Sequence, residues 1–518
     1  MPATPAPAGT TARTETGPTP TTPPRARRLA LVAALVAAVL TALLWLPRPP
    51  SLGPEVSGDA DLAARARTAS AGLDLQGLAV ATGSRGGPVR TAALGAADAR
   101  PDSRRAMTAG TPQEIGSVTK SLTGLLLADA VARGEVEATT TLGEIYPDAG
   151  LDAGLATVTL DELATHRSGL GVVGGRRALG VVAANLSQGN PYRGQTPASV
   201  LQEAQQFQLG GGTRGEFTYS NLGYALLGHA LAEVAGIPYP DLLRQRVLDP
   251  LGMGATLVDP DPRPAGHAHE VDAAGRDVAD WRSAGSAPAG TGVWSTAEDL
   301  GRLMAAVAAG TAPGQDAVRP RGPWQGGESG SGWGFFRAEV QGRTLLLNNG
   351  ATAGGVSSVA LDPATGDWVA LTAPSAVESQ TIAFRLLGLD VAPPTTAQRL
   401  LTLPVGVTLG LVLVAVLAAL RHGLRPRIAP SATRLGVLDG VLGQVLLVAL
   451  LAGIGAWAVV PPGLFAVAVG AATFSAVVHL ARWRVLPGPS GVVPVVGTGF
   501  SLLVSVVLLA LLLGGWPG

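Results

Sequence analysis

Five long apolar runs constrain the fold of this chain more than any other feature of its sequence. The runs cover residues 29–46, 401–420, 437–460, 463–481 and 491–514. About 18 apolar residues are enough to cross the hydrocarbon core of a bilayer. We therefore expect five transmembrane helices, one before and four after a long polar region. A hydrophobic content of 47% with only 14% charged residues agrees with this expectation.

The first run is interpreted as an uncleaved signal anchor. It follows Arg25, Arg27 and Arg28, and the alternative is a cleaved signal peptide. The residues after the run, LWLPRPPSLGPEV, contain no small-x-small cleavage pattern. The anchor is therefore the favoured interpretation.

The short connectors between the later runs predict the orientation. Arginine-bearing connectors are typical of the cytoplasmic side of a membrane. The uncharged loop VVPPG joins the third and fourth runs and is expected outside. The expected cytoplasmic arginines are Arg25, Arg27, Arg28, Arg421, Arg425, Arg427, Arg434, Arg482 and Arg484. This pattern predicts a multi-pass protein of the cell membrane whose polar region is extracytoplasmic.

Changes in composition divide the chain into five parts. Residues 1–28, rich in Pro and Thr, are expected to form a disordered cytoplasmic tail, and 29–46 the anchor. A linker at 47–60 leads to an extracytoplasmic domain at 61–392, and a four-helix transmembrane region occupies 393–518. A net charge of zero argues against nucleic-acid binding, and the lack of cysteine removes disulfides and thiolate chemistry.

Within the polar region, the segment EIGSVTKSLTGL contains the only lysine of the chain, Lys120. Lys120 follows Ser117 by three residues at the start of an apolar-periodic helix, so the two side chains share one helical face. A desolvated lysine can be neutral and accept the proton of a serine hydroxyl, whereas a guanidinium group stays protonated. Ser-x-x-Lys also arises by chance, and Ser at a helix start is often only a cap. The position of the sole lysine favours a nucleophile and its base.

A second motif, Tyr219-Ser-Asn221, precedes the apolar-periodic run LGYALLGHALAEVAG. A phenol and a carboxamide on such a turn can face one cleft, where the phenol shares a proton and the amide binds a substrate. Tyr-x-Asn alone is a weak indication of function. Together with Ser-x-x-Lys about 100 residues upstream, it is specific.

These motifs resemble those of the serine β-lactamase-like hydrolases, which include class C β-lactamases, D-alanyl-D-alanine carboxypeptidases, D-aminopeptidases and esterases. The resemblance covers roughly residues 61–390 and includes TLDELATHRSGL and PAGTGVWSTAEDLGRLM. It implies an α/β fold, in which helices flank an antiparallel sheet and an all-α region is inserted. It also implies that Ser117 is the catalytic nucleophile, Lys120 its base and Tyr219 a proton relay, while Asn221 lines the substrate site.

The third motif of the family, usually Lys-Thr-Gly or His-x-Gly on a strand, is replaced here by Asn348-Asn349-Gly350. The resemblance implies that these residues and Ala351 border the substrate, and that main-chain N–H groups of Ser117 and Ala351 form the oxyanion hole. Asn348 carries no charge, so a substrate carboxylate loses an electrostatic partner. This argues against a true β-lactamase or carboxypeptidase and leaves esterase or amidase chemistry open.

Other polar residues are weaker candidates for catalysis or metal binding. His166 is expected to fix a loop by hydrogen bonding rather than to act in catalysis. His267 and His269, with Glu270 and Asp272, suggest a metal site, but no organised third ligand follows from the spacing, and the resemblance implies neither metal nor cofactor.

The favoured function is a membrane-anchored, extracytoplasmic serine hydrolase that cleaves an ester or amide through an acyl-serine. Its expected partners are the membrane and a small-molecule or cell-wall peptide substrate, with a membrane partner protein left open. The alternative is a catalytically impaired, penicillin-binding-like sensor or partner-binding protein. A transporter is disfavoured because the apolar runs have no ionisable residue near their centres.

Overall fold

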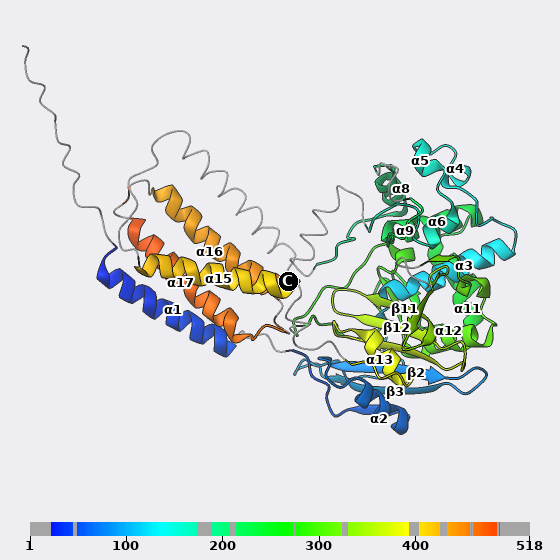
Figure 1. The fold of residues 1–518 in the computed structure, drawn as a ribbon, viewed down its shortest axis with the longest axis horizontal. Helices are drawn as coiled ribbons and strands as arrows, with labels where there is room; N and C mark the ends of the chain where they lie inside the picture. The colour runs from blue at the N-terminus through cyan, green and yellow to red at the C-terminus, as the bar shows by residue number, and fades with distance from the viewer. Residues whose placement is uncertain are drawn as a thin grey trace, which may run out of the picture. The chain divides into compact units, whose positions relative to one another are not determined.

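The computed structural model describes residues 22–44, 49–172, 189–206, 209, 214–273, 275–323, 330–392, 403–424, 433–455, 457, 459–483 and 486. The chain divides into two compact units. One contains most of the polar region from residue 47 onward, and the other contains the long apolar helices near the two ends of the sequence (Figure 1).

An antiparallel sheet is the centre of the polar unit. Its strands follow the order β1-β3-β2-β13-β12-β11-β10-β9-β8, with β4 paired to β3. Every residue of β12 and β13 is buried, as expected for central strands of a sheet that is covered on both faces. The strands are β1 Val56–Gly58, β2 Gly77–Gly83, β3 Arg90–Asp98, β4 Arg105–Ala106, β8 Gly322–Pro323, β9 Gly330–Ser331, β10 Phe336–Val340, β11 Arg343–Ala351, β12 Val356–Leu361 and β13 Trp368–Ala373.

Helices cover both faces of this sheet. α2 (Ala60–Ala69) and α13 (Ser379–Leu386) pack on one face and share a core with the strands. α12 (Ala297–Ala309) packs against β2 and β13 on the other face. The Thr296 side chain caps α12 by accepting from the N–H of Asp299, and Gly310 ends the helix in the left-handed conformation.

A mostly helical region lies beyond α12 and α3 (Thr119–Ala132). Its helix α9 (Asn221–Ala235) begins after Ser220, whose hydroxyl accepts from the N–H of Gly223. A small sheet of order β5-β7-β6 joins this region to the α3 turn. The remaining elements are β5 Gln113–Glu114, β6 Leu257–Val258, β7 Val293–Ser295, α4 Leu142–Ile145, α5 Ala153–Ala156, α6 Leu160–Ala164, α8 Pro197–Gln205, α10 Tyr239–Leu243 and α11 Asp249–Leu251. The predicted α/β class with an all-α insertion is thus confirmed.

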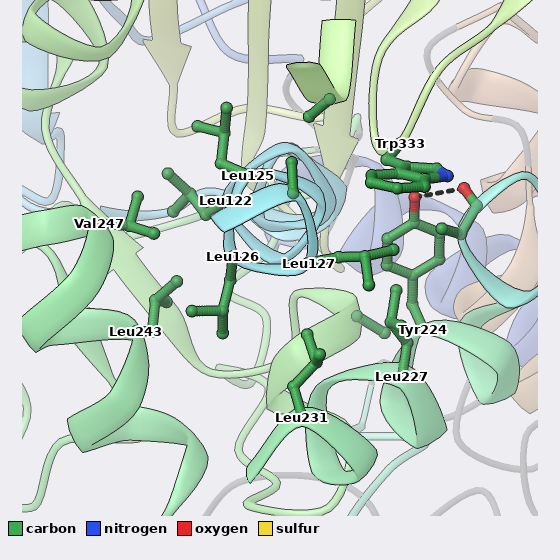
Figure 2. Packing of buried hydrophobic residues seen from close by; sticks show 14 of the residues in the cluster. Leu122, Leu125, Leu126, Leu127, Tyr224, Leu227, Leu231, Leu243, Val247 and Trp333 are labelled. Carbon is green, nitrogen blue, oxygen red and sulfur yellow. Dashed lines mark hydrogen bonds between the residues drawn. The ribbon is translucent and has the colours of Figure 1, made fainter. Parts of the chain in front are cut away.

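Helix α3 lies at the centre of the larger core. Eleven of its residues are buried, because it is enclosed by α9, by the segment around Leu243 and by the loop that carries Trp333. Figure 2 shows leucines of α3 packed against Leu227 and Leu231 of α9. Tyr224 donates from its hydroxyl to the carbonyl of Ala164 at 2.6 Å, which satisfies its polar atom inside this core.

Among the described residues, the apolar unit contains four long helices: α1 Pro24–Leu44, α15 Leu403–Leu424, α16 Arg434–Ile454 and α17 Gly463–Arg482. α17 packs against both α1 and α16. Leucines cover the outer surface of α1; Leu35, for example, is 67% exposed. A helix that exposes so much apolar surface suits a lipid environment better than water.

Three described helices, at Pro24–Leu44, Arg434–Ala452 and Gly463–Arg482, are long and apolar enough to cross a bilayer. They match the first, third and fourth predicted spans. The second span forms α15, whose apolar stretch Val405–Arg421 is shorter. The fifth predicted span, 491–514, lies outside the described residues, so the predicted five-span count is only partly confirmed.

Replacement of Leu126 by Ala tests the packing of α3. Leu126 is fully buried in the larger core, so the substitution should remove apolar contacts, leave a cavity and lower the unfolding free energy by about 2–5 kcal/mol. The thermal unfolding midpoint of the full-length protein in detergent measures the effect. Val234→Ala on α9, where Val234 is 38% exposed, is the control and should change the midpoint little. Equal midpoints for Leu126→Ala and wild type would contradict this description of the core.

Candidate active site

Ser117 lies on a tight turn that enters α3. The turn is the 3₁₀ segment Gly116–Val118, and Gly116 adopts a φ of +48°. A Cβ built at Gly116 would lie 2.7 Å from the backbone nitrogen of Ala351, and one built at Gly350 would lie 1.9 Å from the carbonyl oxygen of Ile115. Only glycine fits at these two positions. The glycines therefore let the end of β11 touch the turn that carries Ser117.

Lys120 is buried, with 1% of its surface exposed. Its Nζ lies 2.9 Å from Ser117 Oγ and donates to the carbonyl oxygen of Ala289 at 2.6 Å. The amine is also 5.0 Å from the centre of the Tyr219 ring. No acidic side chain appears among the described partners of Lys120, so the amine is held by neutral groups.

Tyr219 is the second side chain that contacts Ser117. Its hydroxyl lies 2.7 Å from Ser117 Oγ. Ser117 Oγ is therefore within hydrogen-bond distance of both Lys120 Nζ and the Tyr219 hydroxyl. The structure brings together three of the residues predicted from sequence, although they come from two segments about 100 residues apart.

Burial affects the two neighbours of Ser117 in opposite ways. It lowers the pKa of the Lys120 amine well below its usual range, because no counter-charge compensates the lost hydration. It raises the pKa of Tyr219 to about 12, which the hydrogen bond to Ser117 offsets in part. Near neutral pH the Tyr219 phenol keeps its proton, whereas the Lys120 amine can be deprotonated. Lys120 is therefore the better proton acceptor of the two.

His166 holds the loop that carries Tyr219. Its Nδ1 accepts from the N–H of Ser220 at 3.1 Å, and its carbonyl accepts from the N–H of Thr218 at 2.7 Å. Burial first, and the nearby charge of Lys120 second, keep the pKa of His166 well below its usual range. A neutral imidazole that accepts at Nδ1 carries its proton on Nε2. These contacts on both sides of Tyr219 agree with the expected loop-fixing role.

Asn221 occupies the first turn of α9. Its Nδ2 donates to the hydroxyl of Tyr192 at 2.7 Å, while its Oδ1 is buried and has no hydrogen-bond partner among the described residues. A buried carbonyl oxygen without a partner is suited to accept an N–H from a bound molecule. No local sequence pattern indicates Tyr192, because the contact joins residues 29 positions apart in the chain.

Asn348 points into the protein. Only 2% of its surface is exposed, and its Nδ2 lies near three acceptors: the carbonyl of Gly334 at 2.8 Å, Ser121 Oγ at 3.0 Å and the carbonyl of Ser117 at 3.2 Å. Its Oδ1 accepts from the N–H of Asn349 at 2.8 Å. The amide thus ties β11 to α3, and its donors are already used within the protein.

The other third-motif residues follow the alternation of strand β11. Asn349 is exposed and Gly350 is buried against the Ser117 turn. A Cβ built at Gly350 would lie 2.8 Å from the backbone nitrogen of Ser117. The main-chain nitrogens of Ser117 and Ala351 therefore lie at one junction, as the predicted oxyanion hole requires.

Two buried glutamates lie behind this junction, and the sequence analysis did not identify them as a pair. Glu114 accepts from the N–H of Trp281 at 2.9 Å, and Glu270 accepts from the Thr352 hydroxyl at 2.8 Å. Each also has one carboxyl oxygen without a hydrogen-bond partner. Burial raises the pKa of Glu114 well above its usual range and that of Glu270 to about 8. One proton shared between them would remove the repulsion of two buried charges.

The residues considered as metal ligands do not converge. His269 Nε2 lies 2.8 Å from a carboxyl oxygen of Asp277, Asp272 pairs with Arg276, and His267 Nδ1 donates to the carbonyl oxygen of Pro264. Within the described part of the chain, no group of three or more His, Cys, Asp or Glu residues is arranged to hold a metal ion.

Comparisons with known proteins agree with this geometry. The family model described as Beta-lactamase matches residues 62–387. The D-alanyl-D-alanine-carboxypeptidase/endopeptidase AmpH of Escherichia coli K12 is 31% identical over 192 residues, which cover 37% of this chain and 47% of that protein. A beta-lactamase of Pseudomonas fluorescens is 26% identical over 181 residues, or 35% and 46%. The chain thus matches about half the length of these relatives.

Solved structures share the fold. The octameric penicillin-binding protein homologue from Pyrococcus abyssi superposes with a TM-score of 0.54 at 22% identity, covering 64% of this chain and 77% of that one. A class C beta lactamase from Rhodobacter sphaeroides gives a TM-score of 0.52 at 21% identity, covering 62% and 98%. At these identities the likeness concerns the fold alone.

The glutamate pair leads to a prediction about pH and stability. An ordinary glutamate has a pKa of 4.5, whereas that of folded Glu270 is about 8. Between these values the folded state keeps a proton that the unfolded state has released, so stability falls as pH rises, by at most about 1.4 kcal/mol per pH unit. Glu270→Gln cannot ionise and should flatten this decline, with a higher unfolding midpoint than wild type at pH 9.

Thermal unfolding of the full-length protein between pH 5 and pH 9 measures this difference. Glu216→Gln, at an exposed position, is the matched control and should keep the wild-type pH dependence. If Glu270→Gln and wild type lose stability in parallel above pH 5, Glu270 does not hold a proton in the folded state that the unfolded state has released.

Proposed function

The chain belongs to the Beta-lactamase family, and from this premise we propose that it is a membrane-anchored serine hydrolase that cleaves an ester or amide through an acyl-serine intermediate. One observation carries the proposal. Ser117 Oγ lies within 2.9 Å of the amine of Lys120, a lysine that is buried without a counter-charge. That contact supports a serine made nucleophilic by a neutral base.

In the proposed acylation, Ser117 Oγ attacks the carbonyl carbon of the substrate and its proton passes to Lys120 Nζ. The tetrahedral oxyanion accepts hydrogen bonds from the main-chain N–H groups of Ser117 and Ala351. The proton then moves to the leaving group through the hydroxyl of Tyr219, which touches the same serine oxygen. The phenol keeps its own proton near neutral pH, so it relays a proton and does not act as the primary base.

Hydrolysis of the acyl-serine completes the cycle. Water attacks the acyl carbon and its proton passes through the Tyr219 hydroxyl to Lys120 Nζ. Ser117 Oγ then leaves and takes that proton back, which restores its hydroxyl. Asn221 binds the acyl side of the substrate through its unpartnered Oδ1, a position suited to an amide N–H. This favours acyl groups that carry an amide near the scissile bond, as in peptides.

The environment of Asn348 bears on the substrate class. Its amide is uncharged and hydrogen-bonded inside the protein, so it attracts a substrate carboxylate less than a lysine or histidine would. We therefore favour neutral esters and amides over β-lactams. The substrate of this chain is accordingly a small molecule or a cell-wall peptide without a carboxylate next to the third motif.

The position of the enzyme follows from the apolar helices. We place residues 61–392 outside the cytoplasm, held by the anchor at 29–46 and by the transmembrane region at 393–518. The long apolar helices and the arginine-bearing connectors support this orientation.

Labelling with a fluorescent fluorophosphonate tests the nucleophile and its base. Wild type should be labelled, and Ser117→Ala should abolish labelling because the attacked phosphorus needs Oγ. Lys120→Arg should slow labelling about 10²–10⁴-fold, since arginine cannot accept the proton. Ser121→Ala, which removes a buried hydroxyl of α3 bonded to Gly334, is the control for the nucleophile and should keep labelling. Labelling that survives Ser117→Ala would place the nucleophile elsewhere, and turnover of a chromogenic ester separates an enzyme from a sensor that acylates once.

Replacement of Asn348 by Lys tests the proposed substrate preference. A cation at this position should raise the rate of acylation by a fluorescent penicillin, which bears a carboxylate, relative to a neutral ester by about tenfold or more. Asn349→Lys adds the same charge at the neighbouring exposed position and should leave the ratio near the wild-type value. An unchanged ratio in Asn348→Lys would show that the third motif does not select substrates by charge.

A further inference from the structure

The apolar unit contains a groove that the proposed chemistry does not use. The groove has a volume of about 440 Å³ and lies between α1, α15 and α17. Its lining is almost wholly apolar and includes Leu31, Ala34, Leu420, Gly470 and Phe474. A groove of this character on lipid-facing helices can hold a hydrocarbon chain.

Two arginines lie on the helix faces that line this groove. Arg27 precedes Leu31 by four residues on α1, and Arg482 follows Phe474 by eight residues on α17. A spacing of four or eight residues keeps side chains on one face of a helix. Both arginines therefore extend the groove toward the same end of the unit, which the sequence predicts to be cytoplasmic.

The packing of α1 on α17 agrees with this alignment. A Cβ built at Gly470 would lie 3.0 Å from the carbonyl oxygen of Ala34, and Arg482 Nε donates to the hydroxyl of Thr22 at 2.9 Å. Between these two contacts the residue number rises by 12 on α17, from Gly470 to Arg482. On the other segment it falls by 12, from Ala34 in α1 to Thr22 just before α1. The two helices are thus antiparallel, and Arg27 lies five residues along the chain from Thr22, the residue that Arg482 contacts.

The two guanidinium groups have unmet hydrogen-bonding capacity. Nε and Nη2 of Arg27 and Nη2 of Arg482 are buried and have no partner among the described residues. The two charges also repel each other. Arg27 lies in the first turn of α1, where the helix dipole disfavours a cation. An anion between the two arginines would accept the unpaired N–H donors, reduce the repulsion between the charges and offset the unfavourable helix dipole.

We propose that α1, α15 and α17 form a binding site for an anionic phospholipid. The phosphate accepts hydrogen bonds from Arg27 and Arg482, and an acyl chain lies in the groove lined by Leu31, Ala34 and Phe474. The two positive charges favour an anionic headgroup. Because the apolar groove leads toward the arginine pair, the site suits a lipid better than a free anion. The proposal rests on the membrane anchoring proposed above.

Native mass spectrometry of the full-length protein in detergent tests the site. The probes are dioleoyl phosphatidylglycerol and dioleoyl phosphatidylcholine, which share acyl chains and differ in charge. Wild type should retain phosphatidylglycerol at least tenfold better than phosphatidylcholine. The double variant Arg27→Gln/Arg482→Gln should lose this preference, whereas Arg25→Gln/Arg28→Gln, which removes two exposed charges of α1, should keep it.

Two further arms separate the headgroup from the acyl chain. Ala471→Phe fills the groove without changing charge and should reduce retention of phosphatidylglycerol. Excess inorganic phosphate should not displace the lipid; displacement would mean a free-anion site and overturn the proposal. Equal retention of both lipids by wild type, or equal loss in the two double variants, would also overturn it.

Two controls keep this result separate from the other proposals. Helical circular dichroism shows whether each variant is folded, and retention of wild-type protein in carbonate-washed membranes tests the anchoring by itself. Fluorophosphonate labelling of the same samples reports the hydrolase site independently, since none of the substituted residues belongs to it.

Discussion

The desolvation of one amine is the interaction on which the proposed chemistry depends. Lys120 is enclosed by Ser117, Tyr219 and the carbonyl of Ala289 and has no carboxylate beside it. Its burial favours the neutral amine, so the same packing that builds the core around α3 also prepares a proton acceptor. A salt bridge at this point would stabilise the ammonium form and remove that property. A change in the packing around α3 would therefore also change the proposed basicity of Lys120.

The contact between β11 and the Ser117 turn is the second constraint. It needs glycine at positions 116 and 350, and it brings two main-chain nitrogens to one junction. Asn348 fastens the strand to α3 from inside, and the buried Glu114 and Glu270 lie behind the turn. The loss of a charged third motif leaves this scaffold intact, because the scaffold depends on backbone contacts and buried hydrogen bonds rather than on the missing charge.

Much of the fold and of the site could be predicted from local patterns. Ser117 and Lys120 share a helical turn, and Tyr219 and Asn221 share a loop, so their pairing needs only short-range geometry. Tyr192, Ala289 and the Glu114–Glu270 pair could not be predicted, since these contacts join distant segments and carry no periodic signal.

The sequence by itself determined which residues could supply a nucleophile, a base and a membrane anchor, because residue chemistry and hydrophobic periodicity are local properties. It also determined the family, through four motifs in the expected order. Only the tertiary structure decided that Lys120 is buried with no counter-charge among the described residues, that the donors of Asn348 are used internally, and that Arg27 and Arg482 lie toward the same end of an apolar groove. Burial and pairing depend on segments far apart in the chain, and no local pattern encodes which of them will meet.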